Sequence, residues 1–142
     1  MKIKNIRLVN FGALIAHEEE KETNKNSTTG YFLYSSKIKF LNNSDIIIGK
    51  TGLKFGIEYF IVGDELYDPT VNFICKILHP ILTNPISKEN VYEIVEIKSG
   101  FLNEINFDYY SFEFDWEVQK GMWIFQIIEN EKVLLEKAIE IK

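Results

Sequence analysis

Residues 109–118 alternate between apolar side chains and more polar ones without a break. Because successive side chains of a β-strand point to opposite faces of a sheet, this period of two predicts a strand with one buried and one solvated face. The predicted buried face comprises Tyr110, Phe112, Phe114, Trp116 and Val118. The predicted solvated face comprises Tyr109, Ser111, Glu113, Asp115 and Glu117. A sheet covered on one side only is typical of antiparallel architectures.

Residues 54–62 show the same alternation, with Phe55, Ile57, Tyr59 and Ile61 on one face. Turn residues separate further extended segments, which we predict at residues 3–15, 31–41, 45–48, 70–78, 91–98, 122–128 and 133–141. The pattern therefore predicts about eight or nine short strands and no long helix, which indicates an all-β sandwich.

Four segments are less regular than these strands. Residues 17–30 are the most polar stretch and are expected to form an exposed loop. Pro80 is expected to end the strand before it, because proline cannot donate to a ladder. A helix competes with a strand over residues 131–142, where we favour a strand paired with residues 122–128 as a hairpin. Gly12 marks a β-bulge or a close approach of two backbones.

The chain of 142 residues suits one domain, and residues 1–142 are interpreted as a single β-sandwich domain. A domain of this size buries roughly two-thirds of the surface that its unfolded chain exposes, which is enough for a core without disulfides. The predicted core consists of aromatic side chains from the alternating strands: Phe55, Tyr59, Phe73, Phe112, Phe114, Trp116, Trp123 and Phe125.

Three short motifs follow one another in the chain. Residues 54–59 contain Phe-Gly-x-x-Tyr, residues 79–80 and 84–85 read His-Pro and Asn-Pro, and residues 114–125 contain Gly-x-Trp-x-Phe. Together they resemble a family of small bacterial domains of unknown function with an immunoglobulin-like sandwich. Lys120 departs from that pattern, since such turns often carry a proline before the glycine. The resemblance implies an immunoglobulin-like antiparallel β-sandwich, and it implies no activity or catalytic residue.

Charge and cysteine content narrow the classes of partner and compartment. The net charge is −5 and no basic stripe is present, so nucleic-acid binding is disfavoured. Cys75 is the single cysteine, which fits a reducing compartment. No run approaches the ~20 apolar residues of a membrane-spanning helix. We expect a cytoplasmic protein; a periplasmic or secreted one is the alternative if residues 1–16 are a signal peptide rather than a first strand.

Enzyme motifs are not found in the sequence: it has no Gly-x-Ser-x-Gly elbow, no P-loop and no Gly-x-Gly-x-x-Gly. Cys75 and His79 would lie about 13 Å apart on one strand, too far for a thiol–imidazole pair. Asp64, Glu65 and Asp68 could hold calcium, but acidic residues are common in exposed turns. We therefore predict a protein that is not an enzyme and has no metal or other cofactor.

Two groups of residues remain as binding candidates. Glu113, Asp115 and Glu117, with Tyr109, form either an acidic docking face for a basic partner or a merely solvated face. His79 and Asn84 lie in the second group, a proline-bracketed loop at one end of the sandwich; it either binds a ligand or keeps the sheet edge from pairing with a neighbour.

These features favour a non-enzymatic module that binds a protein partner, or a second copy of itself, through a sheet face or edge strand. The alternative is a module that binds a small ligand or carbohydrate through the loops at one end of the sandwich.

Overall fold

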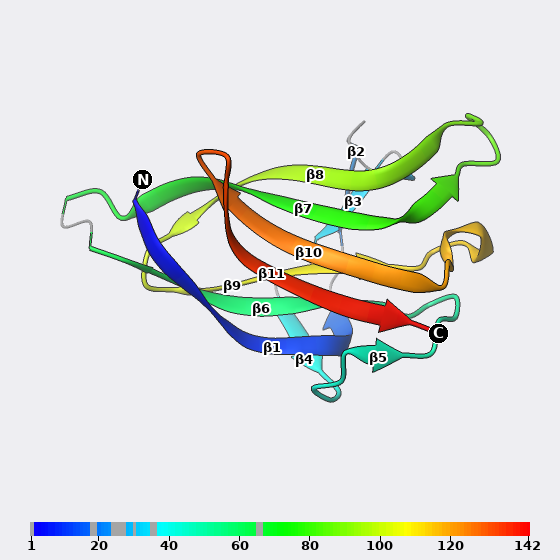
Figure 1. Ribbon diagram of the computed structural model, residues 1–142, viewed down its shortest axis with the longest axis horizontal. Coiled ribbons are helices and arrows are strands. Elements are labelled where there is room, and N and C mark those ends of the chain that lie inside the picture. The colour runs from blue at the N-terminus through cyan, green and yellow to red at the C-terminus, as the bar shows by residue number, and fades with distance from the viewer. Residues whose placement is uncertain (1, 18–19, 24–27, 30, 35–36, 65–66) are drawn as a thin grey trace.

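The computed structural model describes residues 2–17, 20–23, 28–29, 31–34, 37–64 and 67–142. Two twisted sheets pack face to face and form a β-sandwich (Figure 1). The only helix in these ranges is one turn of 3-10 helix, η1 (Asp115–Glu117). The predicted all-β class is confirmed.

The four-stranded sheet has the order β4-β1-β6-β9, and every neighbouring pair in it is antiparallel. Its strands are β1 (Ile3–His17), β4 (Lys37–Phe40), β6 (Lys54–Gly63) and β9 (Ile105–Ser111). The alternation read from the sequence places Phe55, Ile57, Tyr59 and Ile61 of β6 in the interior, where all four are fully buried.

The five-stranded sheet has the order β5-β11-β10-β7-β8. Its strands are β5 (Ile46–Ile47), β7 (Thr70–Thr83), β8 (Asn90–Phe101), β10 (Gly121–Glu129) and β11 (Lys132–Ile141). β10 and β11 form the predicted hairpin, so the helical alternative for the C-terminal segment is wrong. β5 pairs with β11 in parallel, which makes this sheet mixed rather than purely antiparallel as predicted.

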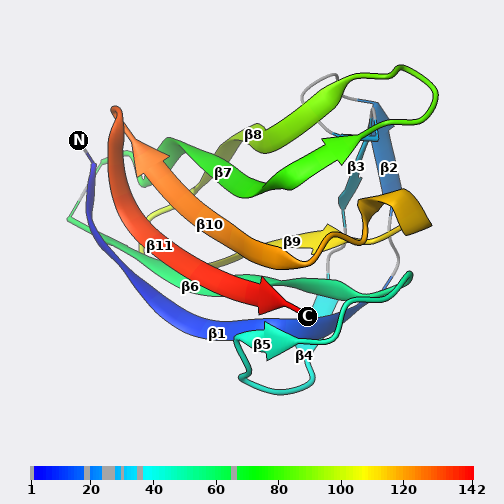
Figure 2. The ribbon, with the colours of Figure 1, turned by 45° about the vertical axis from the view of Figure 1, so that its right-hand side comes forward.

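A third, two-stranded ribbon consists of β2 (Glu20–Thr23) and β3 (Tyr31–Tyr34). Figure 2 shows this ribbon spanning from the four-stranded sheet towards β7 and β8. The predicted loop over residues 17–30 is therefore wrong for β2, and the side chain of Thr28 is buried. Residues 18–19, 24–27 and 30 of that predicted loop lie outside the described residues. The strand predicted over residues 31–41 is two separate strands, β3 and β4.

Gly12 lies where β1 passes close to the segment after β4. Its φ is +117°, and an added Cβ would lie 2.7 Å from the backbone oxygen of Asn42 and 2.9 Å from that of Ser44. This confirms the predicted close approach, because neither the space nor the backbone conformation suits a side chain. The nearest register shift lies between Leu8 and Asn10.

The strand predicted over residues 109–118 ends at Ser111, earlier than expected. The cause is the carboxylate of Glu117, whose Oε1 accepts hydrogen bonds from the backbone N–H groups of Glu113 (3.0 Å) and Phe114 (2.9 Å). These bonds turn the chain into η1 instead of continuing the ladder. Phe114 is consequently 46% exposed and Trp116 only half-buried, which corrects their assignment to the core.

Proline at position 80 does not end its strand as predicted. β7 continues to Thr83, and the register with β8 shifts between Leu78 and Leu82. The irregular pairing accommodates the missing N–H of Pro80 within a long strand. The other predicted core aromatics, including Trp123, are buried between the sheets.

Candidate functional site

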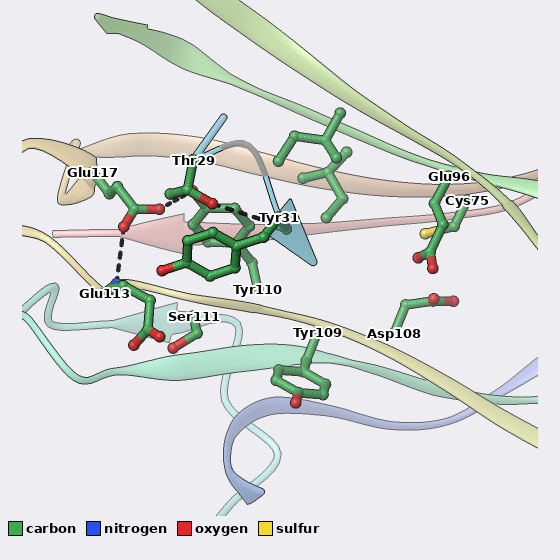
Figure 3. A pocket seen from close by; sticks show the side chains of 12 residues that line it. Thr29, Tyr31, Cys75, Glu96, Asp108, Tyr109, Tyr110, Ser111, Glu113 and Glu117 are labelled. Atoms are coloured by element: carbon green, nitrogen blue, oxygen red, sulfur yellow. Dashed lines mark hydrogen bonds between the residues drawn. The ribbon is translucent and has the colours of Figure 1, made fainter. Parts of the chain in front are cut away.

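A cavity of about 60 Å³ lies between β9 of one sheet and β7 and β8 of the other. Strand alternation explains which side chains line it: Asp108 and Tyr110 point inward from β9, and Cys75 and Ile77 point inward from β7. Ile94 and Glu96 of β8 lie opposite Ile77 and Cys75 in the β7–β8 register. Thr29 and Tyr31, at the start of β3, complete the wall (Figure 3). We call this space the inter-sheet pocket.

The lining is rich in carboxylates and tyrosines. Its carboxylates are Glu96, Asp108, Glu113 and Glu117. Its tyrosines are Tyr31, Tyr109 and Tyr110. Figure 3 shows Tyr31 beside Tyr110 and Glu117 at one end of the pocket, and Cys75, Glu96 and Asp108 at the other. Polar groups that converge beside apolar walls are typical of ligand sites.

A chain of hydrogen bonds holds one end of the inter-sheet pocket together. The hydroxyl of Tyr110 donates to Glu117 Oε2 and lies 2.7 Å from Thr28 Oγ1. Asn84 Nδ2 in turn donates to the backbone oxygen of Thr28 at 3.2 Å. These hydrogen bonds hold residues 28–29 over the pocket, although Thr28 is far in sequence from both Tyr110 and Asn84.

Glu117 is the most deeply buried carboxylate of the site, with 1% of its surface exposed. Burial raises its pKa, although hydrogen bonds from Tyr110 and from two backbone N–H groups act in the opposite direction. Burial, together with the charges of Glu113 and Glu117, also raises the pKa of Tyr31. A buried carboxylate with a raised pKa in a cleft costs stability, and such groups gather at functional sites.

The other end of the pocket is organised by a buried ion pair. Lys98 Nζ of β8 lies 2.5 Å from Asp108 Oδ1 of β9 and donates to the backbone oxygen of Phe107 at 3.1 Å. The hydroxyl of Tyr59 donates to Asp108 Oδ2 at 2.6 Å. These bonds tie the outermost strands of the two sheets to each other at this side of the sandwich.

Cys75 lies at the same end and is buried. Burial raises the pKa of its thiol well above the usual value, and the neighbouring Asp108 raises it further. A thiol in this environment is a poor nucleophile, because the thiolate is the reactive form.

The structure separates the residues that the sequence put into one acidic face. Tyr109, Glu113 and Glu117 all line the inter-sheet pocket. Asp115 is exposed and accepts a hydrogen bond from the hydroxyl of Thr51. The predicted acidic docking face is wrong for Glu117, which turns inward with η1 and is buried.

His79 and Asn84 do not form the predicted binding loop. Asn84 closes the turn between β7 and β8, where its Oδ1 accepts hydrogen bonds from the backbone of Ile86 and Ser87. The ring of His79 is 7% exposed and stacks on Trp123 with the centroids 4.8 Å apart. Its Nδ1 lies 2.7 Å from the backbone oxygen of Pro80, and its buried Nε2 has no hydrogen-bond partner among the residues described.

We expect His79 to make the fold sensitive to mild acid. Burial lowers its pKa in the folded protein, while an unfolded histidine titrates near pH ~6.5. The folded state then binds the proton less well, so the contribution of this group to stability is present above pH ~6.5 and is lost as the pH falls through the folded pKa. Urea unfolding of the wild type and of His79→Phe at several pH values measures this. The wild type should lose stability relative to the variant as the pH falls; parallel curves would contradict the prediction.

Sequence reasoning missed Tyr31, Glu96 and Asp108 as pocket residues. A signal for two of them was present, because Glu96 and Asp108 are charged residues at positions where strand alternation requires an inward side chain. Tyr31 carried no such signal, since its place over the pocket depends on the β2–β3 ribbon.

The acidic turn after β6 does not gather into a metal site in the part of the chain that is described. Lys4 Nζ lies 2.5 Å from Asp64, and Lys2 Nζ lies 3.2 Å from Asp68. Glu65, the third carboxylate of that turn, lies outside the described residues. The described residues contain no group of three or more His, Cys, Asp and Glu side chains that could hold a metal ion.

A comparison with solved structures bears on the fold. A crystal structure of an immunoglobulin-like protein from Pseudomonas aeruginosa superposes with a TM-score of 0.68 at 18% sequence identity, covering 96% of each chain. The immunoglobulin-like class is thereby confirmed. No protein-family model matches the chain, and no curated protein matches it. Among the residues that the structure describes, no helix is long and apolar enough to cross a membrane.

Proposed function

We propose that this protein is a non-enzymatic binding module that holds a small ligand in the inter-sheet pocket. The observation that carries the proposal is the cavity itself, which four carboxylates and three tyrosines line beside Ile77 and Ile94. Immunoglobulin-like sandwiches commonly use their ends and surfaces for binding. Of the two functions considered from the sequence, this geometry favours the small ligand, although the pocket lies between sheet edges rather than among the end loops.

The volume limits the size of such a ligand. A cavity of about 60 Å³ offers room for about four to six water molecules. This space fits a short-chain molecule, or one functional group of a larger molecule that extends into solvent.

Two of the edge strands, β8 and β9, are poorly suited to pairing with a partner strand. β8 carries Glu96 and Lys98 at inward-facing positions, and β9 carries Asp108. Inward-pointing charges on edge strands are a common protection against edge-to-edge association, because a new neighbour would bury them further. Binding of a partner through either of these edges, a mode that the sequence favoured, is therefore less well supported than binding of a small ligand in the pocket.

The outer face of the five-stranded sheet supports a second candidate function, the binding of a protein partner. The register aligns Ile97 of β8, Ile74 of β7, Ile128 of β10 and Val133 of β11 across that face. Ile97 is 78% exposed and Val133 46% exposed at the two ends of this row, whereas Ile128 between them is buried.

Chemical-shift mapping with an isotopically labelled protein tests the proposal. Small probes of three charge classes (an alkylammonium, an alcohol and a carboxylate) are titrated in turn. At least one probe should shift the methyl signals of Ile77 and Ile94 in a saturable way. Shifts confined to Ile97 and Val133 would favour the outer face instead, and no saturable shift at the pocket with any probe would contradict the proposed function.

A variant that fills the pocket, compared with a matched control, tests the same proposal. Ile94→Phe adds a ring at the wall of the cavity and should abolish the saturable shifts, at a cost in stability of about 1–3 kcal/mol from overpacking. Ile97→Phe makes the same exchange on the same strand but on the solvent-facing side, and should leave pocket binding unchanged.

A further inference from the structure

We propose that the ligand of the inter-sheet pocket is a small organic cation, a primary ammonium group on a short alkyl stem. This inference rests on the proposed function, since it assigns a ligand class to the same pocket. It follows from three properties of the lining: its shape, its aromatic surface and its charge.

The shape suits a short stem with a charged end. Ile77 and Ile94 give an apolar wall on the side of β7 and β8, with Glu96 two residues further along β8. Asp108 lies opposite on β9, and Glu113 and Glu117 follow β9 in the chain. A stem of a few carbon atoms can cover the apolar wall, while the head remains within reach of the carboxylates. The cavity of about 60 Å³ matches such a molecule.

The aromatic surface favours a cation. Tyr31 and Tyr110 line the same end of the pocket, and the negative face of an aromatic ring attracts an ammonium group. The ring of Tyr31 already attracts one ammonium group of the protein: Lys21 Nζ, which is not a lining group, lies 4.7 Å from the ring centroid.

The charge of the lining favours a cation over an anion. Four carboxylates line the pocket, and among the described residues no lysine or arginine does. Two adjoining ammonium groups are engaged by lining residues: Lys98 pairs with Asp108, and Lys54 donates to the hydroxyl of Ser111. The charge of Asp108 is thereby balanced, and the uncompensated negative charge lies at the end of Glu113 and Glu117.

Two of these carboxylates have no cation beside them in the part of the chain that is described. Within it, Glu117 accepts hydrogen bonds from neutral donors, which are Tyr110 and two backbone N–H groups. The half-buried carboxylate of Glu113 has neither a hydrogen bond nor an ion pair within the described ranges. An ammonium group in the pocket would supply the charge partner that this end lacks.

Isothermal titration calorimetry with three probes of similar size tests the assignment: n-butylammonium, n-butanol and butyrate. We expect n-butylammonium to bind with a dissociation constant of about 1 mM or tighter. n-Butanol should bind at least about tenfold more weakly, and butyrate should not bind.

Variants separate charge from shape. Glu113→Gln removes one charge at a side chain that makes no hydrogen bond to a described residue. It should weaken the binding of n-butylammonium about tenfold and leave that of n-butanol unchanged. Glu131→Gln removes an equal charge in the exposed β10–β11 turn and should change neither probe.

The outcomes distinguish this inference from the proposed function. If n-butanol or butyrate binds in the pocket as tightly as n-butylammonium, the pocket remains a binding site and the cationic class is wrong. The cationic class is also wrong if Glu113→Gln leaves the affinity for n-butylammonium unchanged. If no probe gives heat or shifts the Ile94 methyl signal, the proposed function itself fails.

Discussion

Replacing Trp123 with alanine should lower the free energy of unfolding by about 3–5 kcal/mol. The indole is fully buried, and its ring lies 5.4 Å from that of Phe55 and 5.2 Å from that of Phe112. Its Nε1 also donates a hydrogen bond to the backbone oxygen of Gln119 at 3.0 Å. The substitution would therefore leave a large cavity between rigid aromatic neighbours, and the close packing of two sheets allows little collapse.

The half-buried Trp116 is the matched control for this experiment. It stacks on the exposed Phe114, with the ring centroids 6.1 Å apart, at the edge of the core. Trp116→Ala should cost only about 1–2 kcal/mol, because less apolar surface returns to water. Urea unfolding followed by far-ultraviolet circular dichroism measures both values without relying on tryptophan fluorescence. A loss below about 1 kcal/mol for Trp123→Ala would contradict its central place in the core.

Lys98→Met should be nearly as destabilising, at about 3–5 kcal/mol, although it keeps the alkyl stem of the side chain. It removes the ammonium group that faces Asp108, a carboxylate with only 5% of its side-chain surface exposed. Tyr59 would remain as a hydrogen-bond donor to Asp108, but a buried carboxylate without a cation is costly.

A double-mutant cycle distinguishes charge from packing at this ion pair. Asp108→Asn in the Lys98→Met background removes the carboxylate charge that has lost its ammonium partner, and should recover part of the lost stability. Asp108→Asn alone should cost less than Lys98→Met alone, since the partly exposed Lys98 can reach water. If the double variant is no more stable than Lys98→Met, the buried charge is not the cause of the loss.

The sheets could be predicted from the sequence because their signal is local. The alternation in β6 and the hairpin of β10 with β11 follow from side-chain period and turn residues, and both are confirmed. The error over residues 112–118 has a specific cause. Phe114, Trp116 and Val118 keep the period of a strand, but the carboxylate of Glu117 binds the backbone N–H groups of Glu113 and Phe114 and makes a turn instead.

The candidate site was only partly predictable, because it depends on contacts between distant segments. Glu113 and Glu117 were identified as candidates on the assumption of an exposed acidic face, and the structure places them at a pocket instead. Thr28 meets Tyr110 across 82 positions of the chain, and no local pattern reports such a contact. The charged residues at inward-facing strand positions, Glu96 and Asp108, were the feature of the sequence that could have indicated the pocket.

A crystal structure of the protein soaked with n-butylammonium would show whether the inter-sheet pocket holds an ammonium group. We predict that the amine lies in the pocket, with its stem against Ile77 and Ile94 and its head towards Glu113 and Glu117. An amine bound on the outer face of the five-stranded sheet would contradict this placement. So would a pocket that holds only solvent at a concentration that saturates the calorimetric signal.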